Sequence, residues 1–197
     1  MTTPGTARER AKAERTDAIL SATAELFAAR GYPGVSLEEI GAAVGVSGPA
    51  VYRHFAGKQA LLGALLIGVS ERLVAGGLDV SSAAASPRER MEALIAFHVR
   101  FALGNAEVIR VQDRDIAYLT DEARADVRRL QRAYIELWID ALAALIDEDR
   151  DSLRLRVQAC FGLLNSTPHS TSAALRARVD TAHVLSGMAL AALLAQG

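Results

Sequence analysis

The chain has 197 residues, of which 51% are hydrophobic and 23% are charged, and its formal net charge is −1. This length holds one large domain or two small ones, and the hydrophobic fraction is ample for a buried core. The near-neutral charge excludes a basic protein that coats DNA over its whole surface, and the single cysteine, Cys160, excludes an intrachain disulfide.

Neither a membrane span nor a secretory signal is evident in the sequence. No apolar run approaches the roughly 20 residues that a membrane-spanning helix needs. The first residues, MTTPGTARERAKAERTD, are polar rather than hydrophobic. We therefore expect a cytoplasmic protein that has no membrane partner.

Helical periodicity runs through nearly the whole chain, and no alternating strand pattern persists. The predicted fold class is therefore all-α, with nine helices in two domains. Residues 1–57 are expected to form a three-helix N-terminal domain, and residues 58–197 a larger helical domain that begins with a linking helix over 58–76. In chain order the predicted helices span 7–30, 37–44, a short stretch after Ser47, 58–75, 87–103, 106–119, 121–146, 151–166 and 172–194, with a loop over 79–86.

The segment 35–62 has the pattern of two short helices joined by a tight turn and followed by the start of a third. Ser36 and Glu39 form a capping box that begins the first of these helices, and Gly45 suits the left-handed conformation that ends it. Ser47 is placed to cap the next helix. This layout favours a helix-turn-helix that puts one helix in the major groove of DNA. A helix pair without DNA binding is the alternative that the pattern alone leaves open.

Three stretches resemble the TetR/AcrR family of bacterial transcriptional regulators in order and spacing: ILSATAELFAARGY at 19–32, SLEEIGAAVGVS at 36–47 and VYRHFAGKQALL at 51–62. The resemblance covers about the first 65 residues. It implies an all-α homodimer whose C-terminal domain, here 58–197, dimerises and binds a small-molecule effector. The function implied is a ligand-responsive transcriptional regulator, expected to be a repressor, that binds a near-palindromic DNA operator.

Nine residues of the N-terminal unit are expected to contact DNA. Residues 48–50 open the reading helix, where small side chains allow close approach to a thymine methyl group. Arg53 can read guanine or hold a phosphate, and Lys58 lies at a helix start that suits a phosphate. Tyr52 and His54 match family positions that contact phosphates. The full set is Ser36, Ser47, Gly48, Pro49, Ala50, Tyr52, Arg53, His54 and Lys58.

A basic stretch precedes this unit on the first predicted helix. Arg8, Arg10, Lys12 and Arg15 could run along the DNA backbone or the minor groove. A solvated, charged helix start is an equally weighted alternative. Because the chain is near neutral, binding should rest on a limited set of phosphate contacts.

One monomer reads too few base pairs to be specific, so two copies are expected. Their reading helices should lie about 34–36 Å apart on straight B-DNA. Apolar and small residues at spacings of three and four in the last two helices predict a four-helix dimer interface. The alternative is that these stripes face the monomer's own core. The candidate interface residues are Leu153, Val157, Phe161, Leu164, Leu175, Val179, Ala182, Ser186, Ala189 and Leu193.

An effector pocket is expected among the fifth to eighth helices, lined by aromatic residues and a few polar groups. Arg110 and Arg114 could bind an anionic ligand, with ion pairs within the helix as the alternative. The segment 162–170, with the charges of 110–115, resembles a branch of the family that regulates acyl-CoA and lipid catabolism, which implies an acyl-CoA or lipid-related effector. The candidate lining residues are Phe97, Arg100, Phe101, Arg110, Arg114, Tyr118, Tyr134, Trp138, Phe161 and Asn165.

An enzyme is the main alternative from another class of protein. No G-x-S-x-G elbow accompanies Ser166, His169 and Ser170, and the four histidines lack metal-ligand spacing. No glycine pattern for binding phosphates is evident. We therefore expect no catalysis, no metal and no cofactor. Activation instead of repression, and DNA binding without a small-molecule inducer, are further alternatives.

Overall fold

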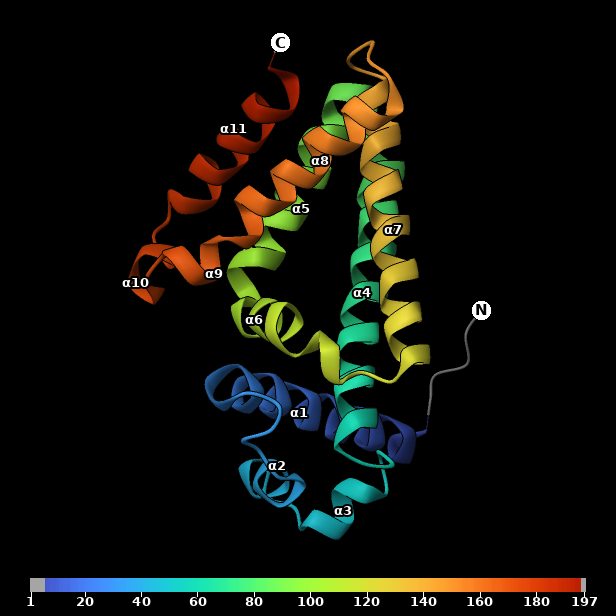
Figure 1. The fold of residues 1–197 in the computed structure, drawn as a ribbon, viewed down its shortest axis with the longest axis vertical. Coiled ribbons are helices and arrows are strands. Elements are labelled where there is room, and N and C mark those ends of the chain that lie inside the picture. Colours follow the sequence, from blue (N-terminus) through green and yellow to red (C-terminus); the bar gives the residue numbers. More distant parts are fainter. Residues whose placement is uncertain (1–5, 196–197) are drawn as a thin grey trace.

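The computed structural model describes residues 6–195, and within them the secondary structure is entirely helical (Figure 1). This confirms the all-α prediction. The ends of the two expected domains, 1–5 and 196–197, lie outside the described residues. The helices are α1 (Ala7–Arg30), α2 (Leu37–Ala43), α3 (Gly48–Tyr52), α4 (Lys58–Ala83), α5 (Pro87–Gly104), α6 (Ala106–Asp115), the 3-10 helix η1 (Ile116–Tyr118), α7 (Asp121–Ala143), α8 (Arg150–Asn165), α9 (Thr167–Ser170), α10 (Ala173–Arg176) and α11 (Thr181–Leu194).

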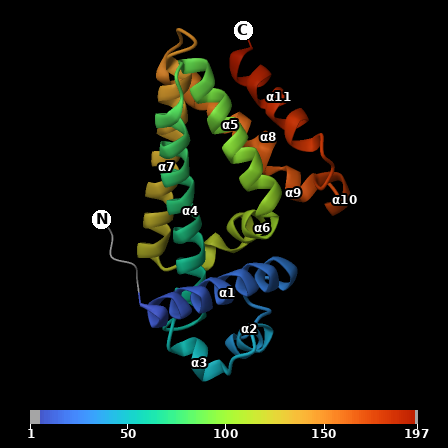
Figure 2. The same cartoon turned by 180° about the vertical axis from the view of Figure 1, so that it is seen from behind.

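Helices α1 to α3 form one end of the molecule, and α11 ends at the other (Figures 1 and 2). The long helix α4 starts beside α3 and runs into the larger part of the molecule, where it packs against α5 and α7. Helix α6 lies across α1 and contacts it directly. Both α4 and α6 therefore connect the end formed by α1 to α3 with the larger part of the molecule.

Local chemistry sets the boundaries of the first helices, as predicted. The Ser36 hydroxyl accepts the Glu39 N–H, and the Glu39 carboxylate accepts the Ser36 N–H, which completes the capping box before α2. Thr6 and Glu9 form a second capping box before α1. Gly45 adopts φ +70° after α2, a conformation that glycine tolerates best. Ser47 is the N-cap residue of α3, as predicted, but its hydroxyl makes no capping hydrogen bond, so the expected side-chain cap is wrong.

The physical reason for that correction is Pro49. Proline lies in the first turn of α3 and has no N–H for a capping hydroxyl to bind. The next N–H, that of Ala50, donates to the backbone carbonyl oxygen of Ser47 at 2.8 Å instead. The backbone of Ser47 thus begins α3, and its side chain stays exposed.

Helix α4 is longer than predicted, and this corrects both its expected end at Gly76–Gly77 and the expected loop over 79–86. The helix continues through both glycines to Ala83. A Cβ atom on Gly76 would collide with the ring of Phe97, and one on Gly77 would lie 2.7 Å from the ring of Tyr134. The glycines therefore let α5 and α7 approach α4, and this packing outweighs their poor helix propensity.

The full length of α4 also corrects the expectation that no apolar run is long enough to cross a membrane. In residues 6–195, α4 has the length and composition of such a helix. However, it is the central helix of the fold and packs against α1, α5 and α7. Its buried side includes Leu61, Leu62, Leu66 and Val69. A core helix meets the same criteria, so this finding is weak evidence for a membrane span.

The predicted ninth helix is wrong in its first third, because the chain forms α10, a turn and then α11. Ser172 caps α10 by accepting the Leu175 N–H. The hydroxyl of Thr181 then donates to the carbonyl oxygen of Leu175 at 2.7 Å. This bond occupies the acceptor that the N–H of Val179 would use in a continuous helix. Smaller differences are the end of α7 at Ala143, before the expected 146, and η1 at the end of the sixth predicted helix.

Two hydrophobic cores follow from this arrangement. The first joins α1 to α3 with the first half of α4, and it includes Val108 and Val111 of α6. The second lies among α5, α7, α8 and α11 and surrounds Trp138. The first core therefore extends beyond the expected domain boundary at residue 57.

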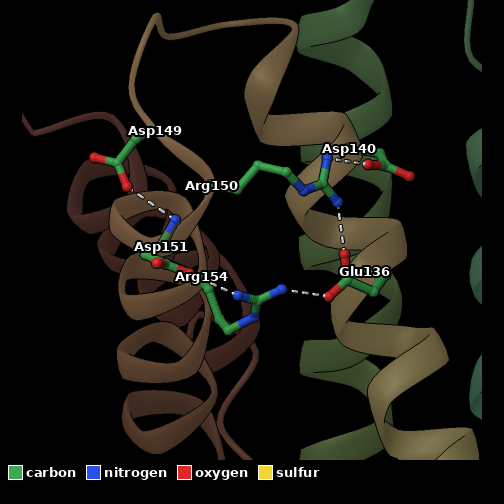
Figure 3. Close-up of polar contacts among 6 residues, drawn as sticks. All are labelled: Glu136, Asp140, Asp149, Arg150, Asp151 and Arg154. Carbon is green, nitrogen blue, oxygen red and sulfur yellow. Dashed lines mark hydrogen bonds and ion pairs between the residues drawn. The ribbon is translucent and has the colours of Figure 1, made fainter.

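Ion pairs join the facing surfaces of α7 and α8 at the end of the molecule that is remote from α3 (Figure 3). Arg150 pairs with Glu136 at 2.6 Å and with Asp140 at 3.0 Å. Arg154 also pairs with Glu136, at 2.8 Å. Because these side chains are exposed, salt should weaken the pairs, and they contribute less to the fold than the apolar contacts beneath them.

The Gly77→Ala variant should destabilise the protein, because its new methyl group would meet Tyr134 and Leu137 at 2.7 and 3.0 Å. We expect a loss of about 1–3 kcal/mol in the free energy of unfolding, measured by urea denaturation. Gly68→Ala on the same helix is the matched control, because its methyl group meets only Arg72, at 3.7 Å. Equal stability of the two variants would contradict the close-approach role of Gly77.

Candidate nucleic-acid interface and internal cavity

The exposed face of α3 lies at the free end of the molecule (Figure 1). Tyr52 is 54% exposed there, and Pro49 and Arg53 are exposed beside it. Gly48 is buried, and a Cβ atom on it would lie 3.2 Å from Glu38 of α2. This corrects the expectation that Gly48 contacts DNA, because the residue sets the approach of α2 and α3 instead.

Basic residues of α1 and of the residues after α3 meet around one shallow depression. Arg8, Lys12 and Arg15 follow one face of α1, and Arg53 and His54 form the opposite side. Among the described residues that line the depression, none is acidic. The structure thus brings three of the four residues of the predicted basic stretch together with the end of the reading helix. Clustered positive charge of this kind attracts the phosphates of DNA.

His54 and Lys58 have structural contacts that the sequence did not indicate. The His54 ring lies 3.1 Å from the Thr16 hydroxyl, which holds the end of α3 against α1. The Lys58 ammonium donates to the carbonyl oxygens of Tyr32 and Val35, each at 2.8 Å. Two of its three donors are therefore used within the protein. Lys58 anchors the start of α4, and one donor remains for a phosphate.

The hydroxyl of Ser36 is also used within the protein, because it donates to the Glu39 carboxylate at 2.9 Å. The Arg30 guanidinium holds Glu39 from the other side at 2.7 Å. Together these hydrogen bonds lower the pKa of Glu39 to about 2, with the Arg30 bond as the largest cause. Ser36 therefore contributes chiefly to the scaffold that orients α2.

An internal cavity of about 220 Å³ lies between α4, α5, α6, α7 and α8. Its apolar wall and its polar groups come from all five helices, and none of its described lining residues is charged. Gln158 is exposed, so the cavity opens to the surface beside α8. The lining residues are Ser70, Leu73, His98, Gln112, Leu130, Gln131, Tyr134, Ile135, Gln158, Phe161 and Asn165.

His98 and Ser70, each 3% exposed, are the most deeply buried polar residues of the cavity wall, and His98 has the larger polar side chain. The Nε2 of His98 lies 3.0 Å from Asn165 Oδ1, and its ring lies 4.7 Å from that of Phe161 and 5.8 Å from that of Tyr134. Burial among these rings lowers the pKa of His98 to about 4, against the opposing effect of the bond to Asn165. The imidazole is therefore neutral at physiological pH.

Three buried polar atoms in this region have no hydrogen-bond partner of good geometry: His98 Nδ1, the Tyr134 hydroxyl and Trp138 Nε1. The Trp138 N–H is nevertheless close enough to the Tyr134 hydroxyl to oppose the rise of its pKa. Buried polar atoms are nearly always paired in folded proteins, so such a group needs an explanation. His98 and Tyr134 line the cavity, whereas Trp138 lies in the core behind it. The first two atoms belong to residues of the cavity wall, so a molecule in the cavity lies next to the residues that carry them.

Of the predicted pocket residues, Tyr134, Phe161 and Asn165 line the cavity and the other seven do not. The sequence analysis missed His98 and the glutamines, because nothing in their spacing marks them as inward-facing polar groups. Phe97 packs against Gly76, Phe101 joins the first core, and Tyr118 stacks on Tyr32. The corrected residues are Phe97, Arg100, Phe101, Arg110, Arg114, Tyr118 and Trp138.

Arg114 and Asp115, at the end of α6, hold the end of α1, and for this reason Arg114 does not face the cavity. The Arg114 guanidinium donates to the carbonyl oxygens of Phe27 and Ala28. It also pairs with Asp115 at 3.0 Å, and that carboxylate raises the pKa of Arg114. Asp115, only 1% exposed, accepts the N–H of Tyr32 at 3.3 Å. We call this group of contacts the α6–α1 clamp.

Two further polar side chains of α6 contact α9. Arg110 donates to the carbonyl oxygen of Pro168 at 2.6 Å, and Asp113 pairs with His169 at 2.9 Å. Gln112, between them in sequence, lines the cavity. Helix α6 therefore touches the cavity, α9 and the end of α1.

The outward surface of α8 and α11 carries large apolar side chains, but these are not the residues predicted for a dimer interface. Leu155 of α8 is 68% exposed, and Val184 and Met188 of α11 are 49% and 51% exposed. Around Gly162 and Gly187 there is open space, where a Cβ atom would meet nothing within 4 Å. We call these five residues the α8–α11 face.

The predicted interface followed the helix stripes that face inward. Five of its residues are buried in the protomer's own core and are corrected: Leu153, Val157, Leu164, Ala189 and Leu193. Phe161 lines the cavity, and Ala182 packs on the second core. Leu175 and Val179 lie on α10 and in the turn after it, and both are exposed. Ser186 is half-buried.

Comparison with known proteins agrees with this architecture. Residues 19–65 match the bacterial regulatory proteins of the tetR family, and residues 84–169 match the tetracyclin repressor-like C-terminal domain. The chain belongs to the TetR family. The two matched segments contain, respectively, α2 and α3 and most of the helices that line the cavity.

Individual relatives cover between 42% and 89% of this TetR-family chain. It is 27% identical over 161 residues to the transcriptional repressor KstR2 of Mycobacterium tuberculosis, which covers 78% of this chain and 77% of that protein. It is 34% identical over 82 residues to the transcriptional activator FasR of Mycolicibacterium smegmatis, over 42% of this chain and 37% of that protein. The fold is similar to that of AibR, solved with isovaleryl coenzyme A and operator DNA, with a TM-score of 0.74, 24% identity and coverage of 89% and 96%.

No group of three or more histidine, cysteine or acidic side chains that could hold a metal ion occurs within residues 6–195. The hydroxyls of Ser166 and Ser170 donate to backbone carbonyl oxygens rather than to His169. Cys160 is buried, and burial raises the pKa of its thiol to about 12. A thiol of this kind is unreactive at neutral pH.

The Lys12→Ala/Arg15→Ala double variant of the TetR-family chain should bind all DNA sequences more weakly, because two phosphate partners are lost from the basic depression. We expect the slope of log K against log salt to fall in magnitude by about 2 for each protomer bound, hence by about 4 for a dimer, measured by fluorescence anisotropy over a salt series. Arg10→Ala is the matched control, because Arg10 is exposed on the same helix but does not line the depression. An unchanged slope in the double variant would remove these residues from the DNA interface.

His98 should make folding sensitive to acid. Below its ordinary pKa of 6.5 the unfolded histidine binds a proton, whereas the folded one stays neutral down to about 4. Because the unfolded state binds more protons in that window, stability should fall as the pH falls from 6.5 to 4. The lowered pKa of His98 changes the free energy of unfolding by up to roughly 3 kcal/mol over this window, at 1.36 kcal/mol per pKa unit.

The measurement is chemical denaturation across that pH window in the native protein and in His98→Gln. The variant should lose stability less steeply with acid, because its amide does not titrate. His183→Gln, which removes an exposed histidine of α11, should keep the native slope. Identical slopes in the native protein and His98→Gln would show that His98 is not held neutral.

Proposed function

We propose that this protein is a transcriptional repressor that binds a near-palindromic operator as a homodimer and releases it when a small molecule fills the cavity. The observation that carries the proposal is the path of α4. This helix begins with Lys58 beside the helix-turn-helix formed by α2 and α3, which we call the reading unit, and its middle supplies Ser70 and Leu73 to the cavity wall. A molecule in the cavity therefore contacts the same helix that is attached to the reading unit.

The DNA contacts proposed for each protomer are the exposed α3 residues and the basic depression. Pro49 and Ala50 are placed for close approach to base edges, and Tyr52 for a phosphate. Arg53 lies where it can reach either a base or the backbone. Ser47 offers a free, exposed hydroxyl. Such a limited contact set fits a protein whose net charge is −1.

The proposed dimer forms through the α8–α11 face. One reading helix contacts only a few base pairs, so specificity needs a second copy at a fixed separation. Leu155, Val184 and Met188 are large apolar side chains exposed on adjacent helices. Gly162 and Gly187 between them allow the helices of two copies to approach closely. Exposed apolar surface bordered by small residues is typical of a protein interface.

The proposed switch uses α6 and α4 together. A molecule in the cavity contacts Gln112 of α6 and Ser70 of α4. It therefore favours the arrangement of these two helices to which it binds more tightly. The α6–α1 clamp then carries a shift of α6 to the end of α1, on which the reading unit packs. Operator affinity falls by the difference in effector affinity between the two arrangements.

An acyl-CoA or lipid-related effector remains the proposed class. AibR was solved with isovaleryl coenzyme A, and KstR2 is named a repressor. In this chain the cavity is small and its described lining is uncharged, so the acyl part would enter it while the phosphates of the carrier stay in solvent. As a DNA-binding regulator, the protein would act in the cytoplasm.

Activation is the second candidate function. FasR is named an activator, and its similarity to this chain covers 82 residues. Repression and activation can use the same DNA-binding unit, so a reporter gene distinguishes them. Repression predicts higher reporter output after deletion of the regulator, and activation predicts lower output.

Selection of bound DNA from random sequence tests the proposed function. We expect an inverted repeat whose half-sites are separated by about one helical turn or a multiple of it. No enriched sequence would overturn the DNA-binding function, and a single unrepeated half-site would overturn the dimer.

The Leu155→Glu/Met188→Glu variant tests the α8–α11 face. Two carboxylates placed in an apolar interface should separate the dimer, because each would be desolvated without a partner. We expect light scattering to show a monomer at micromolar concentration. Affinity for the inverted repeat should fall at least tenfold, which corresponds to roughly 1.4 kcal/mol. Leu78→Glu is the control, since Leu78 is an exposed apolar residue of α4. A native-like dimer in the double variant would contradict this interface.

A further inference from the structure

The cavity carries a chemical signature that narrows the class of molecule it binds, an inference that rests on the proposed function. Two of its wall residues, His98 and Tyr134, are 3% and 5% exposed, and each has a polar atom without a partner. Their rings lie 5.8 Å apart and line the same space. Buried polar atoms that stay unpaired destabilise the free protein, so their pairing by a ligand would stabilise the complex.

The contact with Asn165 decides which atom of His98 is offered. Asn165 Oδ1 can only accept a hydrogen bond, so Nε2 of the neutral ring carries the proton and donates at 3.0 Å. The other nitrogen, Nδ1, is then an acceptor. It is this atom that has no partner. A ligand must therefore bring a hydrogen-bond donor to His98.

Tyr134 offers a complementary group. Burial raises the pKa of its hydroxyl, against the opposing effect of the neighbouring Trp138 N–H, and the hydroxyl therefore stays protonated throughout the physiological range. A phenol hydroxyl both donates and accepts. An oxygen atom in the ligand can thus accept from Tyr134.

Charge is disfavoured in this space. No described lining residue carries a charge, and the walls include Leu73, Leu130, Ile135 and Phe161. A carboxylate or an ammonium group would lose its hydration there without a counter-charge. The cavity measures about 220 Å³, and because one of about 150 Å³ accepts benzene, the part that enters has on the order of ten non-hydrogen atoms.

We propose that the part of the effector inside the cavity is a neutral alcohol, whose O–H donates to His98 Nδ1 and whose oxygen accepts from the Tyr134 hydroxyl. One hydroxyl group satisfies both orphaned atoms, which an ether, a hydrocarbon or a carboxylate cannot do. The hydroxyl can belong to a free alcohol or to a hydroxyacyl chain whose carrier stays outside. His98 and Tyr134 are then the residues that determine specificity.

Matched pairs of probes test this proposal on the full-length protein. The first pair is benzyl alcohol and benzyl methyl ether, and the second is 3-hydroxybutyryl-CoA and butyryl-CoA. Benzoate and benzylammonium test charge. Binding is followed by the fluorescence of Trp138, the only tryptophan, whose ring lies 4.8 Å from that of Phe161 at the cavity.

We expect the hydroxyl-bearing member of at least one pair to bind about fivefold more tightly or better, the effect of one net hydrogen bond. Both charged benzyl probes should bind more weakly than benzyl alcohol. A preference in the benzyl pair indicates a free alcohol, and a preference in the thioester pair indicates a hydroxyacyl group. No preference in either pair, no binding of any probe at millimolar concentration, or tightest binding of a charged benzyl probe would overturn the proposal.

The Tyr134→Phe variant supplies a second readout. It should lose most of the preference for the hydroxyl, while its unfolding temperature without ligand stays equal or rises, because an unpartnered buried hydroxyl is removed. Tyr118→Phe is the matched control, since Tyr118 is exposed and does not line the cavity. A native preference in Tyr134→Phe would show that Tyr134 does not bind the ligand.

Operator binding of the same preparations separates this inference from the proposed function. Sequence-specific DNA binding combined with no hydroxyl preference would overturn only the ligand class. A hydroxyl preference in a protein that binds no DNA would leave the ligand class standing and overturn the regulator.

Discussion

The α6–α1 clamp is the contact on which the proposed regulation depends. Asp115 is almost completely buried, and it holds both the Tyr32 N–H and the guanidinium of Arg114. Arg114 in turn closes the carbonyl end of α1, where a cation is favourable because of the helix dipole. Helix α6 also presents Gln112, three residues before Asp115, to the cavity. Because a short rigid helix carries both contacts, a shift at one of its ends is transmitted to the other.

The interior of the larger domain combines a well-packed core with a polar cavity that is not satisfied by the protein itself. Gly76 and Gly77 bring α4 against α5 and α7 closely enough to exclude a side chain. Beside Ser70 and Leu73 of α4, His98 of α5 and Tyr134 of α7 leave polar atoms unpaired in the wall of the cavity. Unpaired buried polar atoms destabilise the free protein. Such destabilisation is characteristic of binding sites, where the ligand supplies the missing partner. The cavity is thus consistent with a ligand site rather than with a packing defect.

The sequence predicted the features that depend on neighbouring residues and missed those that depend on distant ones. The capping box of Ser36 and the left-handed Gly45 follow from local chemistry, and both were found. The predicted end of α4 was wrong because Gly77 does not end the helix but makes room for Tyr134, a residue 57 positions later. The interface stripes were also wrong, since periodicity identifies an apolar face but not what covers it. His98 was missed for the same reason, because its partner, Asn165, lies on another helix.

A double-mutant cycle on operator affinity tests the coupling between cavity and reading unit most directly, without requiring the natural effector. Gln131→Trp fills the cavity from α7, and Asp115→Asn weakens the α6–α1 clamp while nearly preserving its shape. In the native background, filling the cavity should weaken operator binding at least about fivefold, the lower end of typical allosteric coupling. In the Asp115→Asn background, with its fold verified by circular dichroism, most of that loss should disappear, which is a non-additive result. Equal losses in both backgrounds would show that the clamp does not transmit the state of the cavity to the DNA-binding end.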